Sequence, residues 1–132
     1  MPIMVSSTVV SDLIAAARAA HPHEACGLLM GEGASITAII PAANIHPSPQ
    51  THFEICPQTL IDAHRAARAP GALQILGYYH SHPAGTAQPS ATDRRCAAGD
   101  GRVWAIIAGD EVRLWEDGED GFAPLSFAAC ES

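Results

Sequence analysis

The sequence predicts an α/β fold in which a mixed β-sheet is flanked by a helix on each side. Two segments, residues 8–20 and 57–69, show the apolar spacing of amphipathic helices. Several short runs rich in aliphatic and aromatic residues lie around them, bounded by Gly, Pro and Asn as strands usually are. The 132 residues fit most simply one domain over residues 1–132, which is long enough to bury a core of its own.

The first helix, residues 8–20, is indicated by one apolar stripe and a capping hydroxyl. The stripe consists of Val9, Val10, Leu13, Ile14 and Ala17. Ser7 or Thr8 is placed to cap its N-terminus. Residues 25–30 and 35–40 follow as two strands, which we expect a glycine-containing turn to join as a hairpin.

A loop dense in Pro, Asn and Ser spans residues 41–50. Residues 51–56 (THFEIC) are then predicted to form a short strand. Pro57 favours the start of the second helix, because proline is well tolerated at the first helical position. We expect His64 to be packed or half-buried on the face of this helix that meets the sheet. That face comprises Leu60, Ile61, His64 and Ala67.

The C-terminal half is predicted to contain further strands and one short helix. Residues 73–79 (LQILGYY) form a strand, and residues 91–98 form a helix that Gly99 ends. Residues 103–108 and 111–115 are expected to pair as a hairpin across a Gly-Asp turn. A last strand is expected within residues 122–128, while the order of the strands in the sheet stays open.

The most chemically specific stretch is His-Ser-His-Pro at residues 80–83, which follows a predicted strand. If the strand continues to that point, His80 and His82 project from the same face, because alternate strand residues share a face. Asp93 can fold back to them from beyond a short loop. Two imidazoles and one carboxylate leave a fourth position for water, as catalytic zinc sites do.

Each of these residues also has a purely structural interpretation. Ser90 is suited to cap the helix at residues 91–98, and Asp93 then stands at the third helical position, where an acid is favoured. Capping and metal binding are compatible, because a helix start would hold the Asp93 carboxylate rigidly. The structural alternative for His80 and His82 is a pair of solvated loop histidines.

The order of these residues resembles the JAMM zinc metallopeptidases, also called the JAB or MPN-plus family. That family has an upstream Glu, then His-(Ser/Thr)-His-Pro, a short loop and Ser-x-x-Asp. This chain has Glu24 in Glu-Ala-Cys-Gly-Leu-Leu-Met-Gly, then residues 80–83, then Ser90-Ala-Thr-Asp93. The resemblance covers most of the chain. It implies a curled, half-barrel sheet and a compact, prokaryotic-type member.

The resemblance implies one zinc ion per chain, bound by His80, His82 and Asp93. It also implies that Glu24 is the general base and acid, and that Ser90 donates a hydrogen bond to the developing oxyanion. Zinc lowers the pKa of bound water to roughly 7, and a nearby carboxylate can take the proton and later return it to the leaving amine. A ligand carboxylate has its lone pairs committed, which leaves Glu24 as the free acid. The structural alternative for Glu24 is an ordinary surface glutamate.

Composition argues against several classes of partner. Seven basic residues, all of them Arg, stand against fourteen acidic residues, for a net charge of −7. This balance does not fit a nucleic-acid surface or an anionic membrane surface. The first residues lack the basic segment followed by an apolar segment that is typical of a signal peptide. No apolar run is long enough to span a bilayer. We therefore expect a cytoplasmic location, while the oligomeric state stays open.

The cysteines and the remaining histidines give weaker signals. No C-x-x-C spacing supports a zinc ribbon or a redox motif among Cys26, Cys56, Cys96 and Cys130. Cys26 is more simply a small buried hydrophobe than a reactive thiol. His52 is a candidate for lining a substrate groove. Solvated loop positions are expected for His21, His23 and His46, and core or sheet-face positions for Trp104 and Trp115.

These features together predict a zinc-dependent hydrolase of amide bonds. The resemblance implies cleavage after the C-terminal Gly-Gly of a ubiquitin-like protein. Residues 98–102 leave little room for an insertion that grips a second ubiquitin, which favours a sulfur-carrier or similar protein as the substrate. The alternative is a non-catalytic module that binds ubiquitin-like tails. A nucleobase deaminase would need H-x-E and P-C-x-x-C motifs, which the chain lacks.

Overall fold

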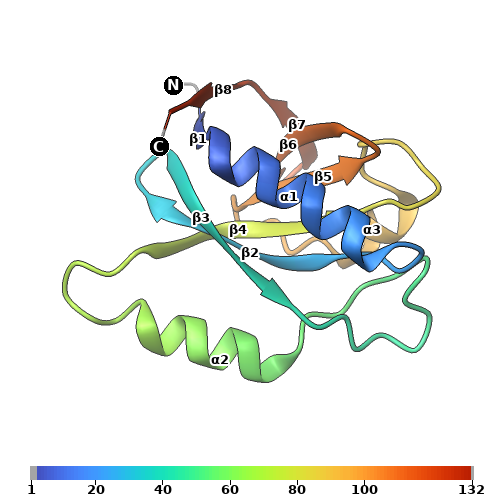
Figure 1. The fold of residues 1–132 in the computed structure, drawn as a ribbon, viewed down its shortest axis with the longest axis horizontal. Helices are drawn as coiled ribbons and strands as arrows, with labels where there is room; N and C mark the ends of the chain where they lie inside the picture. Colours follow the sequence, from blue (N-terminus) through green and yellow to red (C-terminus); the bar gives the residue numbers. More distant parts are fainter. Residues whose placement is uncertain (1–2, 132) are drawn as a thin grey trace.

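The computed structural model describes residues 3–131, which form three helices and eight strands (Figure 1). The helices are α1 (Ser7–Ala20), α2 (Pro57–Ala66) and α3 (Ala91–Cys96). The strands are β1 (Ile3–Ser6), β2 (Cys26–Glu32), β3 (Ser35–Ala42), β4 (Gln74–Ser81), β5 (Val103–Ala108), β6 (Glu111–Gly118), β7 (Gly121–Leu125) and β8 (Phe127–Cys130). All eight strands belong to one sheet, in the order β7-β6-β5-β4-β2-β3-β1-β8.

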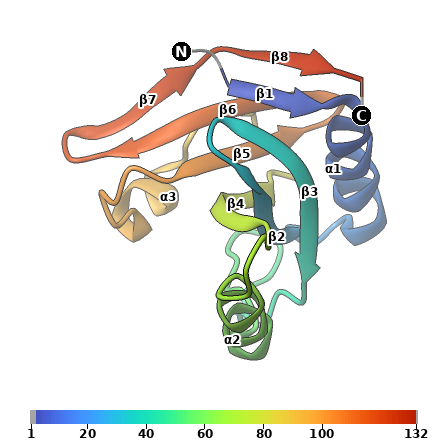
Figure 2. The same cartoon turned by 90° about the vertical axis from the view of Figure 1, so that its left-hand side faces the viewer.

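The sheet curls so strongly that its two edge strands are consecutive in the chain. β7 and β8 stand at opposite ends of the strand order, yet only Ser126 separates them in the sequence. Figure 2 shows the two strands as one bent segment along the rim of the sheet. The sheet is mixed, because β1 pairs in parallel with β3 and β8, and β4 with β5, while the other pairs are antiparallel. These features confirm the predicted α/β fold with a curled sheet.

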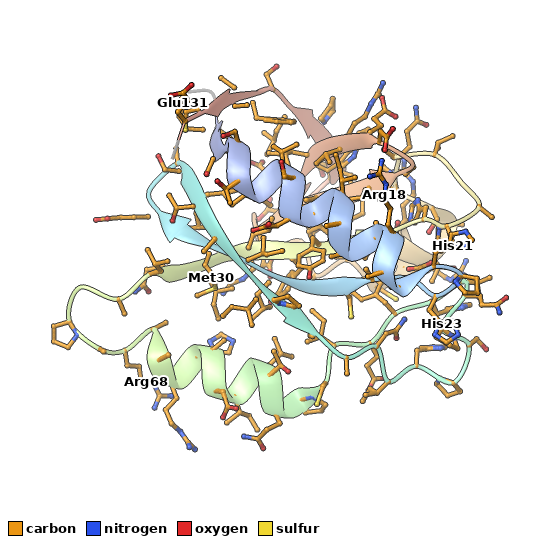
Figure 3. All side chains as sticks on the ribbon, in the orientation of Figure 1. Arg18, His21, His23, Met30, Arg68 and Glu131 are labelled. Atoms are coloured by element: carbon orange, nitrogen blue, oxygen red, sulfur yellow. The ribbon has the colours of Figure 1, made fainter. Side chains whose placement is uncertain are left out.

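Helices α1 and α2 cover opposite faces of the sheet (Figure 1). In β2, Leu29 packs into the core under α1, whereas Leu28 and Met30 pack toward α2. Figure 3 shows Met30 in the space between the sheet and α2. The strand is therefore apolar on both sides, as strands covered on both faces are. Two core clusters result, and the predicted site residues lie at the edge of the one beneath α2.

The structure corrects two expectations about residues 51–69. Residues 51–56 do not form a strand, and their only ladder contact is an isolated bridge between Asn44 and Ile55. Helix α2 ends at Ala66, and its buried face is centred on Ala63. Ile61 and His64 are exposed, so the prediction of a packed or half-buried His64 was wrong.

Three further corrections concern the ends of the chain. The N-terminal strand β1 was not predicted, and the single strand expected at residues 122–128 is divided into β7 and β8. The N-cap residue of α1 is Ser6 rather than the predicted Ser7 or Thr8, and the Ser6 side chain makes no capping hydrogen bond. The other predicted elements are present, with ends shifted by a few residues. No helix within residues 3–131 is long and apolar enough to cross a membrane. The cytoplasmic location stays a prediction.

Candidate metal centre and catalytic residues

Strand β4 delivers both histidines of the motif to the α2 side of the sheet. His80 pairs in register with Cys26 of β2, whose side chain belongs to the core beneath α2. His82 lies just after β4, but its backbone N–H still donates to the carbonyl of Ile107 in β5, at 2.8 Å. The strand geometry thus persists to His82, and the two Nε2 atoms lie 3.0 Å apart.

Helix α3 brings the third predicted ligand to the same point. The Nε2 atoms of His80 and His82 each lie 3.1 Å from the carboxylate of Asp93, which is 4% exposed. A capping box fixes that carboxylate: Ser90 Oγ accepts from the Asp93 N–H at 3.0 Å, and the Ser90 N–H donates to Asp93 Oδ2 at 2.9 Å. Asp93 therefore completes the predicted cap and also lies against both imidazoles, while its role as a metal ligand stays a prediction.

The donor set fits a tetrahedral metal ion. The three ligand atoms lie within 4.8 Å of one another, in a group capable of holding a metal. Ligands bonded to zinc at ~2.0–2.1 Å stand about 3.3 Å apart at tetrahedral angles, close to the spacing found between these atoms. The Nδ1 atom of His82 lies 2.6 Å from the carbonyl oxygen of Thr86 and donates to it. In the neutral ring, its Nε2 atom therefore carries the lone pair that a metal needs.

An aromatic shell holds the His80 ring, and the sequence analysis did not identify it. Phe53 stacks on the imidazole, with ring centroids 4.4 Å apart and an angle of 19° between planes. Trp104 meets the same imidazole edge-on at 5.6 Å. The Nδ1 atom of His80 is buried and has no hydrogen-bond partner within the described residues. The ring is therefore oriented by stacking together with the contact between its Nε2 atom and Asp93.

The electrostatics of the cluster follow from burial and from the carboxylate. Burial lowers the pKa of His80, against the opposing effect of Asp93. Burial acts on His82 in the same direction, but hydrogen bonds with Asp93 and Thr86 raise its pKa overall. Burial opposes ionisation of Asp93 too, yet the hydrogen bonds from both imidazoles hold its pKa well below its usual range. Since ligation requires neutral imidazole, a bound cation competes with the proton on His82.

Glu24 lies beside this cluster, just before β2 begins. The β2–β4 register pairs Cys26 with His80, and the Ser81 N–H donates to the Ala25 carbonyl at 3.0 Å, so Glu24 is opposite His82. The Ser81 hydroxyl, on the other face, accepts from the Ala25 N–H at 2.8 Å. The Glu24 side chain is buried rather than a surface glutamate, and burial raises its pKa to about 7. A cation bound nearby would act in the opposite sense.

Glu24 lines two hollows that also contain other predicted site residues. An apolar cavity of about 320 Å³ has Glu24 and Asp93 among its lining residues, together with His52. Its apolar walls come from Phe53, Ile55, Leu60, Tyr78, Cys96 and Trp104. A polar groove of about 380 Å³ also contains Glu24, and His82 and Ser90 line it. All five predicted site residues thus converge on one region, and the candidate His52 does line a cavity beside them.

The remaining candidates lie outside the cluster. Cys26 is buried, and burial raises the pKa of its thiol to about 11, which agrees with a small core residue. His21 and His23 are exposed near the end of α1, as Figure 3 shows at the rim of the molecule. His46 is half-buried rather than solvated, because its ring stacks on His52 at 4.6 Å. Trp104 is buried, as expected for a core or sheet-face residue, and the Trp115 N–H donates to the Ala87 carbonyl at 3.0 Å.

Comparison with known proteins identifies the family. The profile of prokaryotic homologs of the JAB domain matches residues 6–118. The chain belongs to this family. It is 34% identical over 110 residues to a desampylase from Haloferax volcanii, an alignment that covers 81% of this chain and 78% of that protein. It is 42% identical over 95 residues to a probable TtuB-protein conjugate cleaving protease from Thermus thermophilus, covering 71% of this chain and 62% of that one.

Two further similarities extend this picture. The chain is 34% identical over 97 residues to a CysO-cysteine peptidase from Mycobacterium tuberculosis, covering 72% of this chain and 65% of that protein. A protein from Desulfitobacterium hafniense, with a structure determined in solution, superposes with a TM-score of 0.85 at 32% identity. That superposition covers 98% of this chain and 94% of the other. The predicted family, with its peptidase members, is confirmed.

Proposed function

We propose that this JAB-domain chain is a zinc-dependent hydrolase that cleaves an amide bond after the C-terminal Gly-Gly of a ubiquitin-like or sulfur-carrier protein. One observation supports the proposal: three side chains able to bind a metal, from the end of β4 and from α3, converge beside a buried carboxylate outside their group. A scaffold that only binds a tail has no need for a buried acid next to a metal-ligand set. The relatives named as conjugate-cleaving and carrier peptidases support the substrate class.

In this proposal, His80, His82 and Asp93 hold one zinc ion. When bound there, zinc would supply an activated water near neutral pH and a Lewis acid for the scissile carbonyl. Glu24 takes the proton from the attacking water and returns it to the nitrogen of the leaving group, because it is the acid beside the cluster that is not a ligand. The Ser90 hydroxyl already accepts from the Asp93 N–H, so its own hydrogen is free to be donated to the developing oxyanion.

The groove beside the ligands supports a glycine-ended substrate. The polar groove passes Glu24, His82 and Ser90, so a chain lying in it reaches every proposed catalytic group. Two glycines have no Cβ to meet the groove walls, and they allow a backbone to approach closely. The folded body of the carrier stays outside and contributes binding energy remote from the cleaved bond.

A carrier-cleavage assay tests this function. A small carrier protein is extended past its Gly-Gly, incubated with zinc-loaded protein, and its intact mass is measured. We expect a product that ends at Gly-Gly, and we expect a chelator to abolish it. The matched substrate with Ala-Ala in place of Gly-Gly should show a sharply lower kcat/KM. Equal cleavage of the two substrates, or robust cleavage of unrelated unfolded proteins, would instead identify a general peptidase.

A further inference from the structure

The backbone of Glu24 is held outside the sheet by the loop of residues 43–56. Glu24 precedes β2, and the loop provides the partners of its peptide groups. Its N–H donates to the Pro49 carbonyl at 2.7 Å, and its own carbonyl accepts from Asn44 Nδ2 at 3.1 Å. Both hydrogen bonds come from this one loop, so the loop conformation sets where the Glu24 side chain begins.

The side chain of Asn44 organises this loop. Its amide nitrogen also donates to the His52 carbonyl at 2.9 Å and, more weakly, approaches the Pro49 carbonyl at 3.4 Å. Its amide oxygen accepts from the N–H groups of His46 and Glu54, each at 3.1 Å. An amide has two N–H donors and one oxygen with two lone pairs, and all of them are used here. One side chain thus extends the backbone pairing that residues 51–56 make only at the bridge between Asn44 and Ile55.

The same loop reaches the metal-ligand cluster from its other end. Phe53 follows His52, which Asn44 binds, and stacks on the His80 ring at 4.4 Å. The loop therefore connects the backbone of Glu24 to the imidazole of His80. A buried group that must lie within a fraction of an ångström of its working position needs support of this kind.

We propose that Asn44 is a positioning residue for the reaction, which acts by fixing the backbone of Glu24 relative to the metal-ligand cluster. Asn44 provides no ligand atom, and it does not line the apolar cavity or the polar groove. It lines a third hollow together with Glu24, but His80, His82, Ser90 and Asp93 are not part of that lining. Its effect on turnover must therefore pass through Glu24 and the loop. The proposal rests on the proposed function, because it takes Glu24 to be the proton carrier.

The test compares Asn44→Ala and Asn44→Asp with Gln74→Ala. Gln74 is a matched control, because its amide also donates to two backbone carbonyls, those of Ala67 and Ala72, but at the opposite end of β4 from His80. Asn44→Asp keeps the oxygen that binds His46 and Glu54 but turns an acceptor toward the Glu24 carbonyl. If Asn44→Ala fails to fold, Asn44→Asp still measures the effect of losing only the hydrogen bonds that the Asn44 amide nitrogen donates.

We expect both Asn44 variants to keep stoichiometric zinc and to lose about 10–100-fold in kcat with little change in KM, as changes to residues supporting a site do. Gln74→Ala should keep wild-type kcat. Amide hydrogen exchange should become faster at Glu24, His46 and Glu54 in Asn44→Ala, a readout that does not depend on activity. An unchanged kcat in both Asn44 variants, or a kcat loss that only follows zinc loss, would overturn the proposal.

A double-mutant cycle separates this proposal from the proposed function. If Asn44 acts through Glu24, then Asn44→Ala should change the residual rate of the Glu24→Gln protein by less than about twofold, because the two effects are not additive. Full additivity would show that Asn44 acts by another route, and it would refute the positioning role. Wild-type turnover in Glu24→Gln alone would instead refute the proposed role of Glu24, and with it the proposed mechanism.

Discussion

At the scale of single residues, Asp93 and Ser90 each make two kinds of contact at the site. Asp93 completes a capping box and points its carboxylate at two imidazoles. Ser90 accepts the helix N–H and lines the polar groove. Alternation along a strand and a capping pattern are local signals, so the sequence alone predicted this cluster. Phe53 and Asn44 were not predicted, because their contacts depend on how a distant loop folds over the sheet.

Glu24→Gln tests the proton carrier. The change keeps the shape of the buried side chain and removes the proton acceptor, so zinc content and melting temperature should stay near wild type while nearly all turnover is lost. The loss should appear in kcat more than in KM. Glu54→Gln is the matched control, because Glu54 lines the same apolar cavity but is exposed. Wild-type rates in Glu24→Gln would remove Glu24 from the mechanism.

Ser90→Ala separates capping from chemistry. Loss of the cap should cost ~0.5–2 kcal/mol of stability, and loss of an oxyanion donor should cost ~10²–10³ in kcat. We expect both effects. Ser90→Asn is the matched control, because asparagine is an equally good N-cap but lacks the hydroxyl. It should recover the melting temperature and not the rate. A Ser90→Ala protein with a lowered melting temperature and near-normal kcat would reduce Ser90 to a capping residue.

At the scale of elements, the sequence predicted the strands and helices whose apolar residues recur at a regular spacing. It did not predict the segments whose structure depends on hydrogen bonds to distant parts of the chain. β1 is four residues long and is stabilised by pairing with β3 and β8, which no local pattern reveals. Residues 51–56 have the composition of a strand, but the side chain of Asn44 takes the backbone groups of His52 and Glu54. Tertiary hydrogen bonds thus overrode strand propensity there.

Gly77→Ala tests the contact between β4 and β5 that supports the motif. A Cβ at Gly77 would lie 1.7 Å from the Val103 carbonyl oxygen, so the two strands would have to separate. We expect a destabilisation of about 1–3 kcal/mol or more, measured by denaturant unfolding, with weaker zinc retention because β4 carries His80. Gly85→Ala, whose Cβ would meet only His82 atoms at 3.4 Å or more, should unfold like wild type. Equal stability of Gly77→Ala and wild type would show that the strands adapt freely.

At the scale of the whole molecule, we propose that residues 1–132 form one domain, because strands from both ends of the described chain, β1 and β8, pair in parallel. The curl of the sheet was expected from the family resemblance, whereas its strand order could not be read from the sequence. Pairing order depends on which apolar faces meet in space, and several orders satisfy the same alternation of residues.

The short connection between α3 and β5 predicts that the enzyme has little preference among differently linked conjugates. Only residues 97–102 separate these elements, which provides no insertion to grip a second ubiquitin-like protein. We expect similar rates of release of one carrier from conjugates at different lysines of its target, measured by gel densitometry over time. A strong preference for one linkage would require a docking surface elsewhere on the molecule.

The central claim is that one zinc ion, held by His80, His82 and Asp93, enables this chain to hydrolyse a carrier conjugate. The most direct measurement is turnover of the Gly-Gly-extended carrier while metal-free protein is titrated with zinc. We predict that turnover rises linearly and stops rising at one zinc per chain. His82→Ala should show neither stoichiometric zinc nor turnover, because two remaining ligands cannot enclose the ion. Full turnover by metal-free protein, or no turnover at any zinc content, would contradict the account.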